Sequence, residues 1–355
     1  LLEIYIRKRD IPELIQMQSL NSNSAISQFS RRLVARLGSS WRLPDKRWTS
    51  NTDELSKAYT ELFDDLGYFA LVTVKDNFFR EEIIGLDFWG VPKPGDVQTV
   101  IELITTLEPE ALNLSGRWTD ISFLSQLSSM QELVLENTDV SDLNPLSDLQ
   151  GLIDLKIDNV HVDDITPIKN LRNLKRIVLD STNIDSLTPI RDLYSLKIVG
   201  LQETKIHDLS PLVNLTNLEG LSLAGTSVND LRPLKSLHTL KWLGLEKTPV
   251  SDLTPLRGLS LLSSLNIEET AVIDLEPLEG LFNLNRLSVR NTKVTDLTPL
   301  KGLSNLLQLH IQNTEVTELA PLRELLKLRY VYAEGTSVND LESLDGTSIK
   351  VVFEK

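Results

Sequence analysis

The chain has 355 residues, of which 41% are hydrophobic, and a formal net charge of −14. This length allows a sizeable core and predicts two domains. The chain has no cysteine, which excludes disulfides, thiolate metal ligands and cysteine nucleophiles, and it has no apolar run long enough to span a membrane.

Residues 1–90 are predicted to form an N-terminal all-α domain. Apolar spacing, capping residues and terminal glycines predict four helices there, at residues 11–20, 24–37, 52–67 and 77–86. Residues 69–74 are ambiguous between helix and strand. The first 50 residues carry a net charge of +5, so the remainder carries −19. Arg31, Arg32 and Arg36 on the second helix are therefore candidates for contact with an anionic surface, and a solvated helix face is the alternative.

Residues 91–95, rich in proline and glycine, are predicted to be a linker to a second domain spanning residues 96–355. Residues 96–111 are expected to form an amphipathic cap helix. Repeats are expected from about residue 112, where Leu112 and Leu114 mark a first degenerate strand, to about residue 344. Residues 345–355 are expected to provide a C-terminal edge strand.

A unit of 22 residues repeats in this second domain without a slip. Apolar β-branched residues recur at that spacing at Val140, Val162, Ile184, Ile206, Val228, Val250, Val272, Val294, Val316 and Val338. Prolines recur in the same frame at Pro145, Pro167, Pro189, Pro211, Pro233, Pro255, Pro277, Pro299 and Pro321. A fixed period of this length with an L-x-x-L-x-L segment indicates a leucine-rich-repeat solenoid. The fold class is therefore α/β, with a parallel sheet on the concave side and short 3₁₀ or α turns on the convex side.

Each repeat predicts a strand followed by a turn. In residues 218–223, Leu221 and Leu223 alternate with Gly220 and Ser222, so the two leucines are expected inside and fully buried. In most repeats an Asn, Ser or Thr precedes the proline, and this residue is predicted to cap the turn. A threonine row follows the strands, where its hydroxyls are expected to bond turn backbone and to stack as a ladder. A parallel aspartate row has two interpretations, a calcium site or a local Asx-turn bond, and the spacing of stacked strands favours the latter.

The repeat is similar to the internalin type of bacterial leucine-rich repeat over roughly residues 112–345. The resemblance implies a concave sheet that binds a protein, behind an N-terminal helical cap. This sequence has threonine where that pattern has its ladder asparagine. It also shows no immunoglobulin-like domain or cell-wall sorting motif, so the resemblance does not extend to host-cell invasion or surface display.

No constellation of residues predicts catalysis, a metal site or a cofactor. The four histidines, His161, His207, His238 and His310, fall at four different positions of the repeat frame. Residues 1–90 contain neither histidine nor cysteine, which removes the commonest acid–base residue and nucleophile. We therefore expect a non-enzymatic module, and an enzyme within residues 1–90 is the less favoured alternative.

Two binding roles remain open. The first is a protein-recognition module whose concave face binds a protein partner. The second is a sensor or adaptor whose basic N-terminal domain docks on a membrane or on nucleic acid, while the repeats read a ligand. The acidic solenoid itself argues against nucleic acid. The chain begins with Leu1, so an upstream anchor remains open, and we expect the cytoplasm or the cytoplasmic face of a membrane rather than the cell surface.

Two features of the sheet-facing rows predict the binding site. Ile198 and Trp242 flank a smooth patch that includes Gly220 and Ser222. Further along lie residue types that dominate interface hot spots, namely Arg286, Arg290, His310, Tyr330 and Tyr332. For Trp242 there is an alternative interpretation, in which its ring packs on Gly220 and Gly244 and covers bare backbone.

Overall fold

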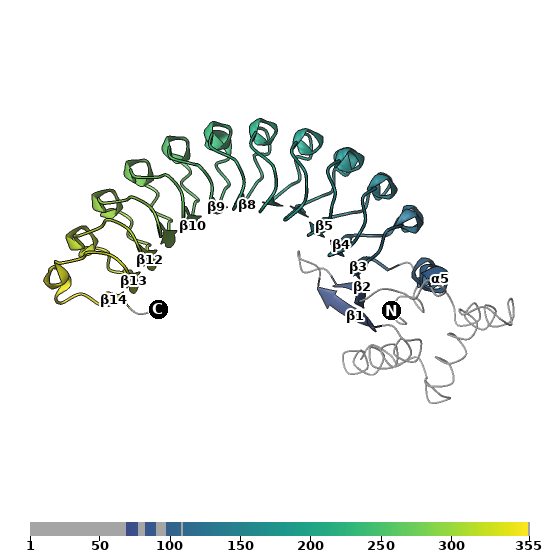
Figure 1. Ribbon diagram of the computed structural model, residues 1–355, viewed down its shortest axis with the longest axis horizontal. Helices are drawn as coiled ribbons and strands as arrows, with labels where there is room; N and C mark the ends of the chain where they lie inside the picture. The colour runs from purple at the N-terminus through teal and green to yellow at the C-terminus, as the bar shows by residue number, and fades with distance from the viewer. Residues whose placement is uncertain (1–68, 77–81, 90–96, 108, 354–355) are drawn as a thin grey trace, which may run out of the picture. The chain divides into compact units, whose positions relative to one another are not determined.

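The computed structural model describes residues 69–76, 82–89, 97–107 and 109–353 (Figure 1). The chain divides into two compact units, Leu1–Val162 and Asp163–Lys355. The helices predicted within residues 1–68, the residues Arg31, Arg32 and Arg36 on them, and the linker at residues 91–95 all lie outside the described residues.

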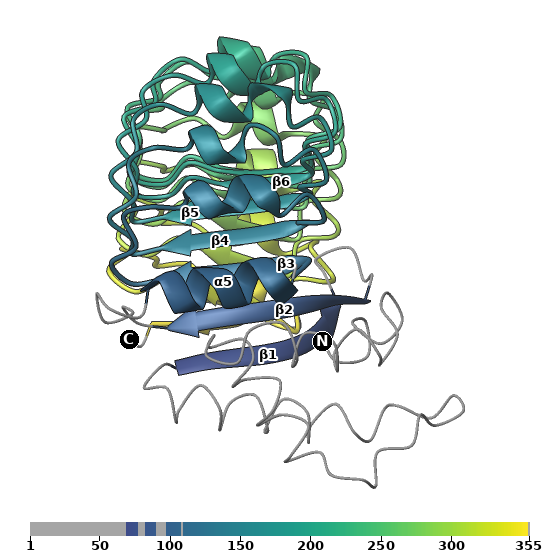
Figure 2. The same ribbon diagram turned by 90° about the vertical axis from the view of Figure 1, so that its right-hand side faces the viewer.

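The first unit contains a sheet that begins with a hairpin. Strands β1 (Phe69–Asp76) and β2 (Glu82–Trp89) pair antiparallel, and β2 pairs in parallel with β3 (Ala111–Ser115). Strands β4 (Glu132–Glu136) and β5 (Asp154–Asp158) continue the parallel sheet. Helix α5 (Val97–Leu107) connects β2 to β3 and packs against the 3₁₀ turn η1 (Ser122–Gln126) (Figure 2). The next turn is η2 (Asn144–Leu146).

The hairpin corrects the all-α prediction for this part of the N-terminal region. The helix expected at residues 77–86 is wrong, because β2 begins at Glu82. In that stretch Ile84, Leu86 and Phe88 alternate with Gly85 and Asp87, which is strand periodicity, and a central glycine disfavours a helix. The ambiguous residues 69–74 form β1. The expected cap helix and first degenerate strand are confirmed as α5 and β3.

The second unit repeats one strand and one 3₁₀ turn along its length. Its strands are β6 (Arg176–Val178), β7 (Ile198–Gly200), β8 (Gly220–Ser222), β9 (Trp242–Gly244), β10 (Ser264–Asn266), β11 (Arg286–Ser288), β12 (Gln308–His310), β13 (Tyr330–Tyr332) and β14 (Lys350–Val352). Its turns are η3 (Thr166–Asn170), η4 (Thr188–Ile190), η5 (Ser210–Leu212), η6 (Arg232–Ser236), η7 (Thr254–Leu256), η8 (Glu276–Leu278), η9 (Thr298–Leu300), η10 (Ala320–Leu322) and η11 (Leu341–Leu344). Within this unit the strands form the concave side and the turns the convex side (Figure 1). The predicted parallel sheet with short convex turns is thereby confirmed, as is the edge strand near the C-terminus.

The core of the second unit lies between the sheet and the turns. Leu221, Leu223 and Leu245 are fully buried, and Leu243 is 2% exposed, as predicted. In register, Leu243 stands between Leu221 and Leu265 of the neighbouring strands. Each inward leucine therefore packs on the equivalent residue of the repeats on either side, so no repeat buries its apolar face alone.

The aspartate row closes the turns by local hydrogen bonds. The Oδ1 atom of Asp252 accepts a hydrogen bond from the backbone N–H of Thr254 at 2.8 Å, and the same bond recurs at Asp142, Asp164, Asp208, Asp230, Asp274 and Asp296. This confirms the Asx-turn interpretation. It also corrects the predicted cap: the residue before the proline is the first residue of the turn, with no side-chain capping bond, and its N–H is bonded by the aspartate. Because this bond needs only the backbone N–H, arginine at Arg232 and glutamate at Glu276 can also occupy the position, and the Arg232 side chain adds bonds of its own to Asp230.

The threonine row closes a left-handed bend after each strand. The Thr226 hydroxyl donates to the carbonyl oxygen of Leu223 at 2.7 Å, and Thr226 is 3% exposed. The same bond is made by Thr182, Thr204, Thr248, Thr270, Thr292, Thr314 and Thr336. The expected bond to turn backbone is confirmed for these eight threonines, while the expected threonine-to-threonine ladder is wrong, because their hydroxyls donate within their own repeats; the buried Thr138 hydroxyl has no partner among the described residues. The residue before each threonine has positive φ, as at Lys247 with φ 56°.

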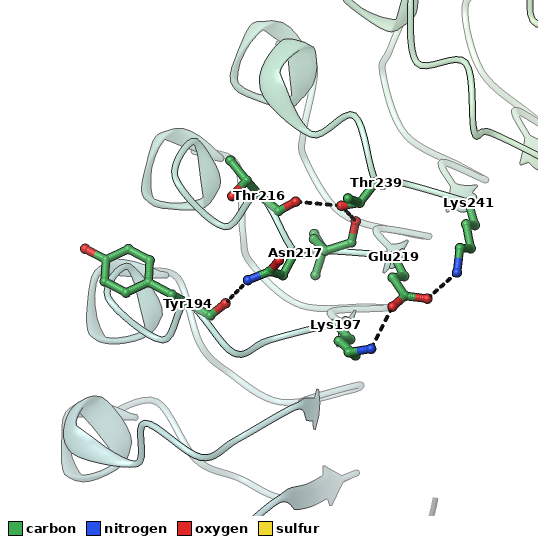
Figure 3. Close-up of polar contacts among 8 residues, drawn as sticks. Tyr194, Lys197, Thr216, Asn217, Glu219, Thr239 and Lys241 are labelled. Carbon is green, nitrogen blue, oxygen red and sulfur yellow. Dashed lines mark hydrogen bonds and ion pairs between the residues drawn. The ribbon is translucent and has the colours of Figure 1, made fainter. Parts of the chain in front are cut away.

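A second polar row joins one repeat to the next (Figure 3). The Asn217 side-chain amide donates to the carbonyl oxygen of Tyr194 at 2.9 Å, and the Thr239 hydroxyl donates to that of Thr216 at 2.7 Å. Beside this row, Glu219 accepts from Lys197 at 2.9 Å and from Lys241 at 2.6 Å. Both lysine hydrogen bonds, with that of Lys241 the stronger, lower the pKa of Glu219. Among the described residues, no helix has the length and apolar character needed to cross a membrane.

Candidate binding surface

The sheet face of the second unit presents rows of side chains in exact register. Pairing of β11, β12 and β13 aligns Arg286 with Gln308 and Tyr330, and Ser288 with His310 and Tyr332. Alternate residues of a strand point to opposite faces of the sheet. The middle residue of each of these strands is buried, so the residues on either side of it lie on the outer face. These strands lie on the concave side of the unit near its C-terminal end (Figure 1).

Five of the predicted site residues gather on this face, and we call Arg286, Arg290, His310, Tyr330 and Tyr332 the aromatic–basic cluster. The His310 and Tyr332 rings stack, with centroids 4.4 Å apart and planes 12° apart. The Tyr330 and Tyr332 rings lie 6.1 Å apart and inclined by 24°. Three near-parallel rings from two adjacent strands thus form one ring stack, with Tyr332 between the other two, and Tyr330 at one end is 38% exposed.

Positive charge borders this ring stack. Arg286 and Arg290 are both exposed, and Arg290 lies 3.5 Å from a carboxylate oxygen of Glu268. The pKa of His310 is lowered, first because the ring is half-buried and then because both arginines repel a proton on it. The imidazole is therefore neutral at pH 7, which suits it for ring stacking.

The Trp242 ring covers part of the smooth patch that it was predicted to flank. A Cβ atom placed on Gly220 would lie only 2.0 Å from Cε2 of the Trp242 ring, so the indole rests on the glycine backbone. Register places Gly220 between Ile198 and Trp242, and the indole fills that space. At Gly244 the nearest atom to such a Cβ is a carboxylate oxygen of Glu246, at 2.8 Å. The alternative interpretation, in which the Trp242 ring covers bare backbone, therefore holds at Gly220. Ser222, on the same strand as Gly220, is buried.

Two features of the face are absent from the sequence prediction. Glu246 accepts a hydrogen bond from the Asn266 side chain, and its pKa is raised, first by burial and then by repulsion from Glu268. Lys350 of β14 pairs in register with Tyr330 and is exposed beside the aromatic–basic cluster. Lys350 is 20 residues after Tyr330 rather than 22, because the last repeat is shorter, so the repeat frame alone does not find it.

The three other histidines do not join His310. His161, His207 and His238 lie outside the strands, in the crossover segments of their repeats. Within the described ranges, no group of three or more His, Cys, Asp or Glu side chains is arranged to hold a metal ion. The arrangement on the sheet face is therefore one of flat rings, guanidinium groups and amides, which are groups suited to contact another molecule.

Solved structures resemble this fold closely. Internalin C2 from Listeria monocytogenes is 31% identical, with a TM-score of 0.50, over 52% of this chain and 82% of that one. Another internalin from Listeria monocytogenes has a TM-score of 0.66 at 24% identity, over 76% of this chain and 86% of that one.

A more distant structure shows the fold alone. The leucine-rich-repeat ectodomain of the plant membrane receptor kinase GASSHO1/SCHENGEN3 from Arabidopsis thaliana, in complex with CASPARIAN STRIP INTEGRITY FACTOR 2, has a TM-score of 0.59 at 14% identity, over 76% of this chain and 34% of that one. No protein-family model matches the sequence, and no curated protein matches it.

Proposed function

The chain belongs to the internalin-type family of leucine-rich-repeat proteins, and from this premise we propose that it is a non-enzymatic module that binds a protein partner on the concave sheet face of its second unit. A distant relative of the same fold, the plant receptor ectodomain, has been solved in complex with CASPARIAN STRIP INTEGRITY FACTOR 2. That complex supports recognition as a use of this fold.

The aromatic–basic cluster is the observation that carries the proposal. A tyrosine on the outer face of a sheet contributes nothing to the core, so its presence there favours a role in binding. Tyr330 is 38% exposed, and its ring lies beside that of Tyr332. Tyrosine and arginine are among the residues most enriched at interface hot spots, where a few side chains carry most of the binding energy. The stacked rings also lose little conformational freedom when a partner covers them, because their contacts with one another already order them.

The position of the cluster on regular backbone supports the same conclusion. Four of its residues lie in β11, β12 and β13, and Arg290 lies two residues after β11. Each of these strands pairs in parallel with a strand on either side. Side chains on such a scaffold are presented in one arrangement, which reduces the ordering that a partner must induce.

Substitutions in the intact chain test the proposal. A partner is first captured with the full chain, and its affinity is then measured by calorimetry for Tyr332→Ala, Trp242→Ala and the parent. We expect Tyr332→Ala to weaken binding by about 2 kcal/mol or more, the usual hot-spot threshold, without unfolding the protein. Tyr194→Ala is the matched control, because Tyr194 is 53% exposed but lies among the convex turns.

Trp242→Ala distinguishes a direct contact from a supporting one. If the indole meets the partner, affinity falls by a similar amount; if it only covers Gly220, the melting temperature falls and affinity does not. A partner that binds the Tyr332→Ala and Trp242→Ala variants as tightly as the parent, with both variants folded, would show that the sheet face is not the binding surface.

A further inference from the structure

The aromatic–basic cluster carries positive charge in an otherwise acidic chain. One row of the sheet runs Arg286, Gln308, Tyr330 and Lys350 across four adjacent strands, with Arg290 close to its start. The chain as a whole has a net charge of −14. The proposed binding surface therefore carries three cations, whereas the protein as a whole is negatively charged.

The two cations at the ends of this row lack a carboxylate partner among the described residues. Some exposed cations of the second unit are paired, since Lys197 and Lys241 share Glu219 and Arg232 bonds Asp230. Within the part of the chain that the structure describes, Arg286 and Lys350 form no ion pair, although both are exposed. Arg290 has Glu268 at 3.5 Å, which is longer than a good charge-assisted hydrogen bond.

The rings lie between these unpaired cations. Tyr330 stands in the same row as Arg286 and Lys350, and the Tyr332 and His310 rings of the next row stack beside it. A ligand that spans the row would meet a guanidinium group at one end, an ammonium group at the other, and flat apolar rings between them. Carboxylates separated by an apolar or aromatic side chain match that order of groups.

We propose that the ligand of this surface is an acidic polypeptide segment, whose carboxylates pair with Arg286 and Lys350 while an apolar or aromatic side chain packs on Tyr330 and Tyr332. This inference rests on the proposed function and names the chemistry of its partner. The planar guanidinium of Arg286 suits a carboxylate in particular, because it can donate two parallel hydrogen bonds to it. Opposite charge also speeds the encounter between partners.

A nucleic acid would find this surface less favourable. Its phosphates form a continuous line of charge, whereas the cations here are bordered by Glu268 beside Arg290 and by Glu334 next to β13. Binding of nucleic acid needs many phosphate contacts to lysine and arginine, whereas the row and Arg290 together supply three cations. A peptide with a few spaced carboxylates avoids those repulsions.

The test uses the full chain and defined probes. Binding of a fluorescent random copolymer of glutamate and tyrosine is measured by anisotropy, with polylysine and a short oligothymidylate as the other probes. We expect the glutamate–tyrosine copolymer to bind, to bind more weakly as salt rises from about 50 to about 500 mM, and to lose about tenfold in affinity in Arg286→Glu.

Arg172→Glu is the matched control, because it makes the same change in net charge at an exposed arginine after η3, on the side of the turns. Failure of the copolymer to bind, or an equal loss in Arg172→Glu and Arg286→Glu, overturns the acidic-ligand proposal. Tighter binding of oligothymidylate, lost in Arg286→Glu, overturns it in favour of nucleic acid. A captured protein partner that needs Tyr332 but binds Arg286→Glu normally would leave the proposed function standing and remove only the acidic ligand.

Discussion

The threonine row offers the sharpest test of how each repeat is held. Thr226 donates to the Leu223 carbonyl oxygen at 2.7 Å, and the backbone N–H of Thr226 donates to the same oxygen at 3.1 Å. In Thr226→Val the side chain keeps its shape and the carbonyl keeps one donor, so only the hydroxyl bond is lost. Val160 occupies the equivalent position in another repeat and is buried there, which shows that the isopropyl group fits.

The expected cost follows from this geometry. A buried hydrogen bond contributes about 0.5–1.5 kcal/mol net, and no cavity is formed, so Thr226→Val should lower the free energy of unfolding by about 1 kcal/mol. For a unit of this size that corresponds to a fall of about 2–4 °C in melting temperature. Urea unfolding followed by far-ultraviolet circular dichroism measures the change. A Thr226→Val protein as stable as the parent, or one that loses as much as a core leucine deletion, would refute the reasoning.

The remaining predictions concern the core, the backbone and pH. Leu243→Ala should lower the free energy of unfolding by about 2–5 kcal/mol, because Leu243 is 2% exposed within the leucine stack; melting within a degree of the parent would contradict the repeat frame. Lys247→Gly should raise it by about 0.5–1 kcal/mol in the same urea assay, because a residue with a side chain is strained at φ 56°, and Gly225 occupies the equivalent position with φ 70°; a loss would show that the bend is unstrained. The lowered pKa of His310 means that its contribution to stability is fully present above pH 6.5 and is lost as pH falls through the lowered value. His310→Gln should therefore reduce the drop in melting temperature between pH 7.5 and 5, and an unchanged drop would contradict it.

The repeat architecture could be predicted because the same 22-residue pattern of apolar and turn residues recurs ten times in the sequence. Alternation at Leu221 and Leu223 predicts the buried face, and the proline predicts the turn. The hydrogen bond from the turn backbone to the aspartate could also be predicted, since an aspartate two residues before the turn has few other local partners. The hairpin of β1 and β2 was harder, because a short apolar stretch without repetition reads equally as helix or strand.

The sequence predicts which residues lie on the candidate binding surface, but it does not predict how their side chains pack. The repeat frame places His310 and Tyr332 side by side on one face, and the structure stacks them. The frame cannot decide whether Trp242 stands up from the sheet or lies across Gly220, because that depends on a side-chain torsion. It also misses Lys350, which joins the surface only because the last repeat is two residues shorter than the others.

The threonine row forms hydrogen bonds within a repeat, and the row that includes Asn217 forms them between repeats. The two rows therefore affect different properties of a repeat array. Thr226 bonds a carbonyl of its own repeat, whereas Asn217 bonds the Tyr194 carbonyl of the repeat before. In a nearest-neighbour description, bonds of the first kind set the intrinsic stability of a single repeat, and bonds of the second kind set the coupling between repeats. A repeat can therefore lose its hydroxyl, as at Val160, and weaken only itself. Loss of the donor at Asn217 would instead loosen the connection between neighbours, so that the array unfolds in segments rather than as one.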